Sequence, residues 1–249
     1  HLCLYILKFI TWSPIIMQPL HLIIAATTVY LFLRFSPFTR LQKALFPFGY
    51  LAFYEYAIIP RNYALGVLLL FLFCILFRDW KAKFPLLGFI LLLLAHTSVH
   101  ALIIVISIGI ALCWELIFTS DRPDRMKIGT GFGLILFGIV TAIVQLKPSG
   151  PDPGFVPGWN TEFGLDLFLK VLNILPKAFF PIPQFNMHFW SSMEGASATS
   201  NVKLVLAILI LLFALVLLLR KPTALVMYLS GTIGLLTCFY TIRFGAIRH

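Results

Sequence analysis

The stretch Phe84–Phe118, FPLLGFILLLLAHTSVHALIIVISIGIALCWELIF, decides how this chain crosses a membrane. As a single helix it would measure about 52 Å at 1.5 Å per residue, against a hydrocarbon core of about 30 Å. The run AHTSVH at 95–100 is its polar interruption. We therefore predict a break there, with a short helix over about 85–95 and a full span over about 98–118.

The composition predicts an all-α polytopic integral membrane protein. Hydrophobic residues make up 60% of the 249 and charged residues only 11%, whereas soluble domains carry about a quarter charged residues. We predict one transmembrane domain over 1–249, with interfacial helices such as about 2–12, and about eight spans. The predicted spans are about 14–33, 42–58, 62–78, 85–95, 98–118, 128–146, 202–220 and 223–241.

The placement of basic residues supports the break. With eight spans, eleven of the nineteen Lys and Arg fall in short loops on one side, which the positive-inside rule makes cytoplasmic. A single helix over 84–118 would move the later basic loops to the other side. The residues in these loops are Arg34, Arg40, Lys43, Arg78, Lys81, Lys83, Arg122, Arg125, Lys127, Arg220 and Lys221.

The long segment at about 147–201 falls on the predicted non-cytoplasmic side. It begins with a Pro/Gly-rich run, and EFGLDLFLKVLNILPKAFF at 162–180 then predicts an amphipathic helix in the membrane interface. Aromatic and carboxylate side chains suit carbohydrate, so several residues of this loop are candidates for binding an acceptor or a sugar. They are Asp152, Trp159, Glu162, His188, Trp190 and Glu194.

The stretch YEYAIIPRNYALG at 54–66 places polar residues at a predicted outer turn, because Pro60 disfavours helix just before it. Glu55, Arg61, Asn62 and Tyr63 lie at or near this turn. One interpretation is ordinary interfacial residues. The other is an Arg–Tyr pair that binds an anionic group, since the guanidinium forms bidentate hydrogen bonds with phosphate.

Other polar or small residues in the spans have alternative interpretations. His96 and His100 could share a helix face as zinc ligands do, but spacing indicates no third ligand; they could also line a polar outer site or simply lie at the interface. Gly129 and Gly133 have the spacing of close helix packing. Glu115 is expected to reach the interface. The sequence contains no basic run with interleaved aromatics, the pattern that would indicate a nucleic-acid partner.

Four stretches resemble the C-type glycosyltransferases, in particular their protein O-mannosyltransferase-like branch. RNYALGVLLLFLFCILF at 61–77 resembles the Arg-x-Tyr-x-Leu segment that opens a span in that family, and LQKALFPFGYLAFYEYAIIP at 41–60 resembles the preceding span. LYILKFITWSPIIMQPLHLIIAATTVYLFLR at 4–34 is similar to the helix, break and span after the family's His-Pro. LLLLAHTSVHALIIVI at 91–106 is similar to its His-containing span break.

The resemblance implies sugar transfer from a polyprenyl-phosphate donor on the non-cytoplasmic face, in what would be a bacterial inner membrane. It implies a role near the donor phosphate for Arg61 and Tyr63. A divalent metal is allowed, although no cofactor is visible in the residues. Two departures matter: Ile59 stands where the family often has an acid, and no acidic residue precedes Glu55. We therefore expect a fragment of a longer chain whose catalytic carboxylate lies upstream.

Two other functions compete with this one. A non-catalytic subunit of a larger membrane complex fits the short apolar helices and the scarcity of acids. A transporter or flippase would call for charged residues at mid-membrane, where the central runs are nearly free of charge.

Overall fold

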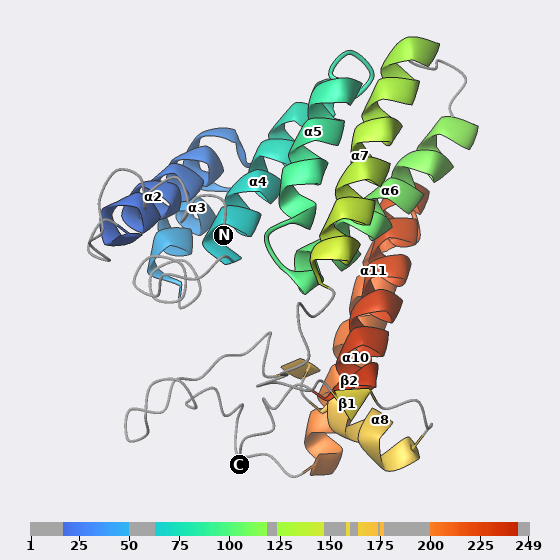
Figure 1. The fold of residues 1–249 in the computed structure, drawn as a ribbon. Coiled ribbons are helices and arrows are strands. Elements are labelled where there is room, and N and C mark those ends of the chain that lie inside the picture. The colour runs from blue at the N-terminus through green and yellow to red at the C-terminus, as the bar shows by residue number, and fades with distance from the viewer. Residues whose placement is uncertain are drawn as a thin grey trace. The chain divides into compact units, whose positions relative to one another are not determined.

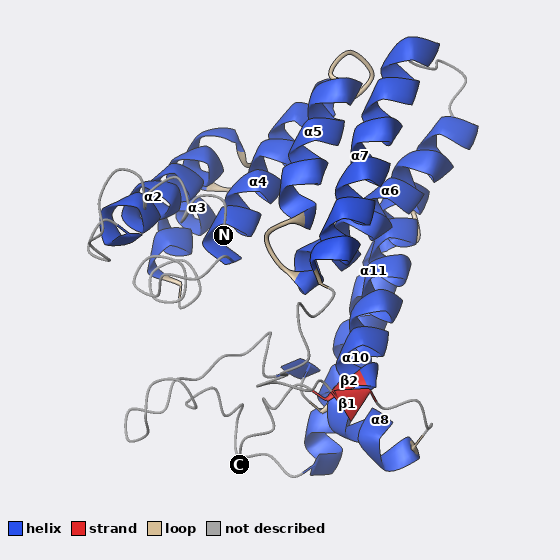
Figure 2. Ribbon diagram, viewed as in Figure 1, coloured by secondary structure: helices blue, strands red, loops and turns tan. Residues whose placement is uncertain are grey.

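The computed structural model describes residues 17–49, 63–118, 124–146, 158–159, 164–173, 175–176 and 200–243. Apart from turns and one pair of two-residue strands, these residues are helical (Figure 2). Five described helices are long and apolar enough to cross a membrane, which marks the chain as the α-helical membrane protein that its composition predicted. They lie at Gln18–Phe35, Val99–Phe118, Arg125–Gln145, Asn201–Leu218 and Pro222–Thr241.

The structure divides into two compact units. Unit 1 comprises 1–105 and 121–146, and unit 2 comprises 106–120 and 147–249, so that helix α6 (Val99–Phe118) contributes to both. The other described helices of unit 1 are α2 (Met17–Phe35), α3 (Arg40–Leu45), η2 (Phe46–Phe48), α4 (Tyr63–Leu76), η4 (Phe77–Asp79), α5 (Phe84–Ala95) and α7 (Arg125–Gln145) (Figure 1).

The predicted break in 84–118 is confirmed, and its side chains explain it. Helix α5 ends at Ala95 after twelve residues and α6 begins at Val99. The Thr97 hydroxyl donates to the Leu94 carbonyl (2.9 Å), and the Ser98 hydroxyl oxygen accepts from the Ala101 amide (3.1 Å). Because these hydroxyls bond backbone groups that the helix ends leave without helical partners, the polar run stops one helix and starts the next.

Helices α5 and α7 run in the same direction and approach closely through glycines (Figure 1). A Cβ placed on Gly88 would lie 2.4 Å from the Gly131 carbonyl oxygen, and one on Gly138 would lie 2.7 Å from the Leu92 Cα. The backbones therefore touch where no side chain intervenes. Gly129 and Gly133, whose spacing indicates close helix packing, take no part in this contact, since nothing described lies within 4 Å of a Cβ at either position.

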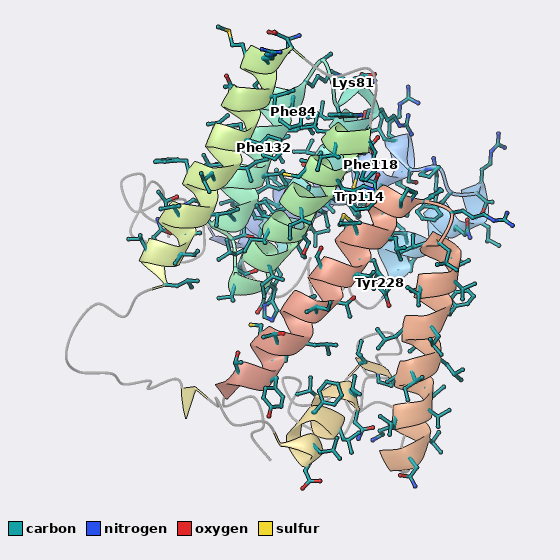
Figure 3. All side chains as sticks on the ribbon, turned by 90° about the vertical axis from the view of Figure 1, so that its right-hand side faces the viewer. Lys81, Phe84, Trp114, Phe118, Phe132 and Tyr228 are labelled. Carbon is teal, nitrogen blue, oxygen red and sulfur yellow. The ribbon has the colours of Figure 1, made fainter. Side chains whose placement is uncertain are left out.

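The helix directions place the basic residues of unit 1 at one end. Phe84, at the start of α5, makes a tilted ring contact with Phe132 near the start of α7 (5.3 Å between ring centroids, 53° between planes); both residues are labelled in Figure 3. At the end of α2, the Phe35 carbonyl accepts a hydrogen bond from Arg78 Nη2 (3.0 Å). The basic segments after α2, between α4 and α5, and at the start of α7 therefore share one end, as the loop charges predicted for this unit. Which side of the membrane this end faces is still a prediction.

The predicted span over about 42–58 is not one continuous helix. Helix α3 ends at Leu45, a single 3₁₀ turn follows over Phe46–Phe48, and Gly49 has an extended backbone (φ −65°, ψ 146°). Pro47 has no amide hydrogen to continue the α-helical pattern, which explains the early end. The remainder of that predicted span lies outside the described residues.

Unit 2 contains α8 (Leu165–Leu172), α10 (Ser200–Leu218), α11 (Pro222–Thr241) and the strands β1 (Gly158–Trp159) and β2 (Ile242–Arg243), in addition to its part of α6. The Tyr228 hydroxyl of α11 donates to the Leu211 carbonyl of α10 (3.1 Å). At the turn into α11, the Thr223 hydroxyl donates to the Glu115 carboxylate of α6. Glu115 therefore helps to hold α6 and α11 together, a role beyond the interfacial one predicted for it.

The opposite end of unit 2 holds part of the long segment 147–201. Gly158 pairs with Arg243 and Trp159 with Ile242 in antiparallel register, and the Gly164 amide donates to the Tyr240 hydroxyl (2.5 Å). Helix α8 buries Val171 and Leu172 and exposes Leu165 and Asp166. An amphipathic helix is thus present within the predicted stretch, over Leu165–Leu172, and its position in the membrane interface stays a prediction.

Candidate functional site

The candidate site is a polar cluster at the end of unit 1 opposite its basic end. We call it the His–Tyr cluster and define it as Tyr63, His96, Thr97, His100 and Thr141. Tyr63 is the first residue of α4, Thr97 lies in the break between α5 and α6, and Thr141 lies near the end of α7. The cluster therefore joins the start of α4, the start of α6, the end of α7 and the break between α5 and α6. Each of these four places contributes a polar side chain.

Tyr63 and His100 are brought together although they are far apart in the sequence. Their ring centroids lie 6.3 Å apart with an interplanar angle of 66°, an edge-to-face contact. Tyr63 is 42% exposed and His100 is half-buried, so both residues remain partly accessible at the surface. The predicted grouping of these two residues is consistent with this geometry.

His96 is oriented by a hydrogen bond from each side of its ring. Nδ1 lies 2.8 Å from the Leu92 carbonyl oxygen, and Nε2 lies 3.1 Å from the Thr141 hydroxyl. Because a carbonyl oxygen can only accept, Nδ1 carries a hydrogen, and Nε2 of the neutral ring is an acceptor. The Thr141 hydroxyl also donates to the Phe137 carbonyl of its own helix (2.7 Å), so its single hydrogen is shared between that carbonyl and Nε2. The exposed imidazole is therefore held in one direction and one tautomer.

His96 and His100 do not share a face of one continuous helix, as their spacing allowed. Spacing of four residues places two side chains on one face only within a continuous helix, and the break at 96–98 lies between them. Within the described part of the chain, no group of three or more His, Cys, Asp or Glu side chains is arranged to hold a metal ion.

Thr97 fits against α4 because residue 66 is glycine. A Cβ on Gly66 would lie 3.2 Å from the Thr97 hydroxyl oxygen, closer than ordinary van der Waals contact. Thr97 itself is buried and bonded to the Leu94 carbonyl. The break is thereby packed directly on the first turn of α4, which fixes His96 and His100 relative to Tyr63.

We expect Thr141→Val to loosen this arrangement. The substitution keeps the shape of the side chain but removes the hydroxyl that meets His96, and interhelical hydrogen bonds in membrane proteins contribute about 0.6–1.7 kcal/mol. The free energy of unfolding of the full chain in detergent should fall by about that amount. Thr130→Val is the matched control, because the Thr130 hydroxyl donates to the Met126 carbonyl of its own helix. Equal losses for the two variants would contradict a specific His96–Thr141 bond.

Sequence reasoning missed two polar residues besides Thr141. Thr97 stands inside a polar run of the sequence. The signal for its role in ending α5 is its position directly after an apolar helix. His21 is only 7% exposed and shares a buried face of α2 with Ala25 and Thr28, at spacings of four and seven residues. It lies in the half of α2 away from the basic end.

The remaining predicted site residues are not brought into this cluster by the described structure. Glu55, Arg61 and Asn62 lie outside the described residues, as do Asp152, Glu162, His188, Trp190 and Glu194 of the long segment. Trp159 lies in β1 of unit 2.

Comparisons of the chain with protein-family models, with curated proteins and with solved structures found no match in any of the three.

Proposed function

We propose that this chain belongs to a membrane glycosyltransferase of the C-type kind, with about eight spans. It would transfer a sugar from a polyprenyl-phosphate donor to an acceptor at the non-cytoplasmic face of a bacterial inner membrane. The single observation that carries the proposal is the meeting of Tyr63, His96 and His100 at the end of unit 1 opposite the basic residues. Under the positive-inside rule that end faces away from the cytoplasm.

The donor phosphate would be bound next to Tyr63. Arg61 precedes Tyr63 by two residues, and two residues of extended chain reach at most about 7 Å. A guanidinium offers paired hydrogen bonds to phosphate oxygens, and Tyr63 and His100 offer further polar groups on the same side. Asn62 and Glu55, polar residues of the same sequence stretch, would contact the sugar.

The position of the cluster also suits a lipid-linked donor. A phosphate group at mid-bilayer would be strongly unfavourable, whereas at the ends of membrane helices it stays in contact with water and headgroups. The apolar polyprenyl chain would lie against the lipid-facing side of the helices, where residues such as Leu93 and Val140 are exposed.

The transfer step requires a base that these residues do not identify. The acceptor hydroxyl would attack the anomeric carbon of the sugar, the bond from that carbon to the phosphate oxygen would break, and polyprenyl phosphate would leave. The proton of the acceptor would pass to a general base. A carboxylate would suit this role, and a divalent cation is compatible with the phosphate leaving group.

The test is sugar transfer by the full protein in sealed vesicles. Membranes should incorporate radiolabel from a polyprenyl-phosphate-linked hexose into a polar acceptor, and vesicles without the protein should not. Failure to bind the polyprenyl phosphate at all would refute the donor assignment. Binding without transfer to any acceptor would refute the enzymatic part.

A second candidate function is that of a non-catalytic subunit in a membrane complex. The observation that favours it is the pair Gly129 and Gly133, which lies on a face of α7 where nothing described comes within 4 Å. Small residues four apart let transmembrane helices of different chains approach closely. Gly129→Leu should then release a co-purifying membrane protein without changing the stability of the isolated chain; retention of every partner would argue against this function.

A further inference from the structure

Unit 1 gathers eight basic side chains at one end, from four segments that are far apart in the sequence. We call this the basic end. Five of the eight side chains are exposed, and the other three are partly exposed. Its members are Arg34 at the end of α2, Arg40 and Lys43 on α3, Arg78, Lys81 and Lys83 between α4 and α5, and Arg125 and Lys127 on α7.

Side-chain contacts join these segments into one surface. The Arg78 guanidinium donates to the Phe35 carbonyl (3.0 Å), which joins the turn after α4 to the end of α2. Trp80 contacts Phe84 edge-on (5.9 Å), and Phe84 in turn contacts Phe132 of α7 (5.3 Å). Figure 3 shows Lys81, Phe84 and Phe132 near one end of these helices.

Helix α3 is fastened to the same surface by aromatic rings. The Phe46 ring stacks on Phe32 of α2 (3.8 Å), and Phe32 also contacts Phe71 of α4 (5.7 Å). This packing holds Arg40 and Lys43 beside the end of α2. Their place in the basic end therefore follows from contacts between described residues.

Few acids oppose this charge. Within the described part of unit 1, the acids at this end are Asp79 and Asp124, and Asp79 is paired with Lys83 (2.9 Å between Nζ and Oδ2). The surface therefore keeps a formal excess of six positive charges, from eight basic and two acidic residues. Such a surface attracts anions.

Large apolar side chains are exposed among the basic ones. Phe48 is 78% exposed, Leu41 69% and Met126 78%. Two cations lie near aromatic rings, Arg34 over Phe35 and Lys81 over Trp80, each 5.9 Å from the ring centroid. An acidic protein or nucleic acid would match the charge but not the exposed apolar groups, whereas a lipid interface matches both.

We propose that the basic end of unit 1 binds anionic phospholipid headgroups, with Phe48, Leu41 and Met126 inserted at the level of the acyl chains. This inference does not rest on the proposed glycosyl transfer, because it concerns the opposite end of the unit. It predicts that the chain retains phosphatidylglycerol in preference to phosphatidylcholine.

The full chain is purified from mixed micelles of phosphatidylglycerol and phosphatidylcholine. Native mass spectrometry then measures how much of each lipid stays bound to the protein. A basic residue near an anionic surface contributes about fivefold to binding. The triple variant Arg40→Gln/Lys43→Gln/Lys127→Gln should therefore lower the preference for phosphatidylglycerol at least tenfold, and by at most about 100-fold. These positions avoid Arg78 and Lys83, whose side chains make the bonds described above.

The matched control removes three positive charges elsewhere, with Lys170→Gln/Lys177→Gln/Lys203→Gln, and should keep the wild-type preference. Raising the salt concentration to 0.5 M should weaken the preference in the wild type, since charge interactions at a surface are screened. An equal loss in both triple variants would overturn the proposal. So would binding of a soluble polyanion such as heparin with no preference between the two lipids, which would assign the surface to an acidic macromolecule.

Discussion

The variant Gly88→Ala is expected to lower the free energy of unfolding of the full chain by about 3 kcal/mol, at the upper end of the usual cost of overpacking. The new methyl group would lie 2.4 Å from the Gly131 carbonyl oxygen and 2.9 Å from its Cα. Both are backbone atoms, so relief requires α5 and α7 to move apart along their whole contact. Native proteins are stable by only about 5–15 kcal/mol, and the loss is therefore a large fraction of the total.

The measurement is the midpoint of unfolding in a detergent titration, followed by circular dichroism. Gly129→Ala and Gly133→Ala are the matched controls, since a Cβ at either position meets nothing described within 4 Å. Alanine is a better helix former than glycine by about 0.5–1 kcal/mol, so these variants should be as stable as the wild type or slightly more so. If Gly88→Ala unfolded at the same midpoint as the controls, the close approach of α5 and α7 would be wrong.

The second large effect is expected for Arg61→Ala in the binding of a fluorescent polyprenyl phosphate. Hydrogen bonds to charged groups contribute about 1.5–3 kcal/mol, which corresponds to roughly a 10- to 150-fold loss of affinity. Arg61→Lys should fall between the wild type and Arg61→Ala, because an ammonium keeps the charge but not the paired geometry. Affinity would be measured for the full chain in detergent micelles.

Arg220→Ala is the control for charge alone, since Arg220 is an exposed arginine between α10 and α11 of unit 2, outside the basic end. It should leave the affinity unchanged. An unchanged affinity for Arg61→Ala would remove the proposed phosphate contact. Equal losses in Arg61→Ala and Arg220→Ala would instead indicate attraction by net charge, without a site beside Tyr63.

Part of the candidate site could be predicted because its signals are local. The pairing of Tyr63 with His100 followed from placing the turn before α4 and the break before α6 on one side of the membrane, which loop charges decided. The bond between His96 and Thr141 could not be predicted, because it joins residues 45 positions apart. It depends on α5 and α7 running in the same direction at a particular rotation.

The glycines of α7 show the same limit. Gly129 and Gly133 lie two residues before and after Gly131, and two residues turn a helix by about 200°, so their face is nearly opposite to that of Gly131. Spacing alone therefore identified glycines suited to close packing but not the face that meets α5. Every face of an apolar span is hydrophobic. The hydrophobic periodicity of its sequence therefore says little about which face is buried against other helices.

By itself, the sequence determined that this is a helical membrane protein, that its chain breaks at residues 96–98, and that the basic segments of unit 1 share one end. These features follow from hydrophobicity, capping hydroxyls and charge, which act over a few residues or across a bilayer as a whole. Only the tertiary structure decided that Gly88 meets Gly131, that Thr141 orients His96, and that Glu115 binds Thr223. Those contacts require two helices to pack at one rotation and one height, and that choice is made by the fit of side chains from distant parts of the chain.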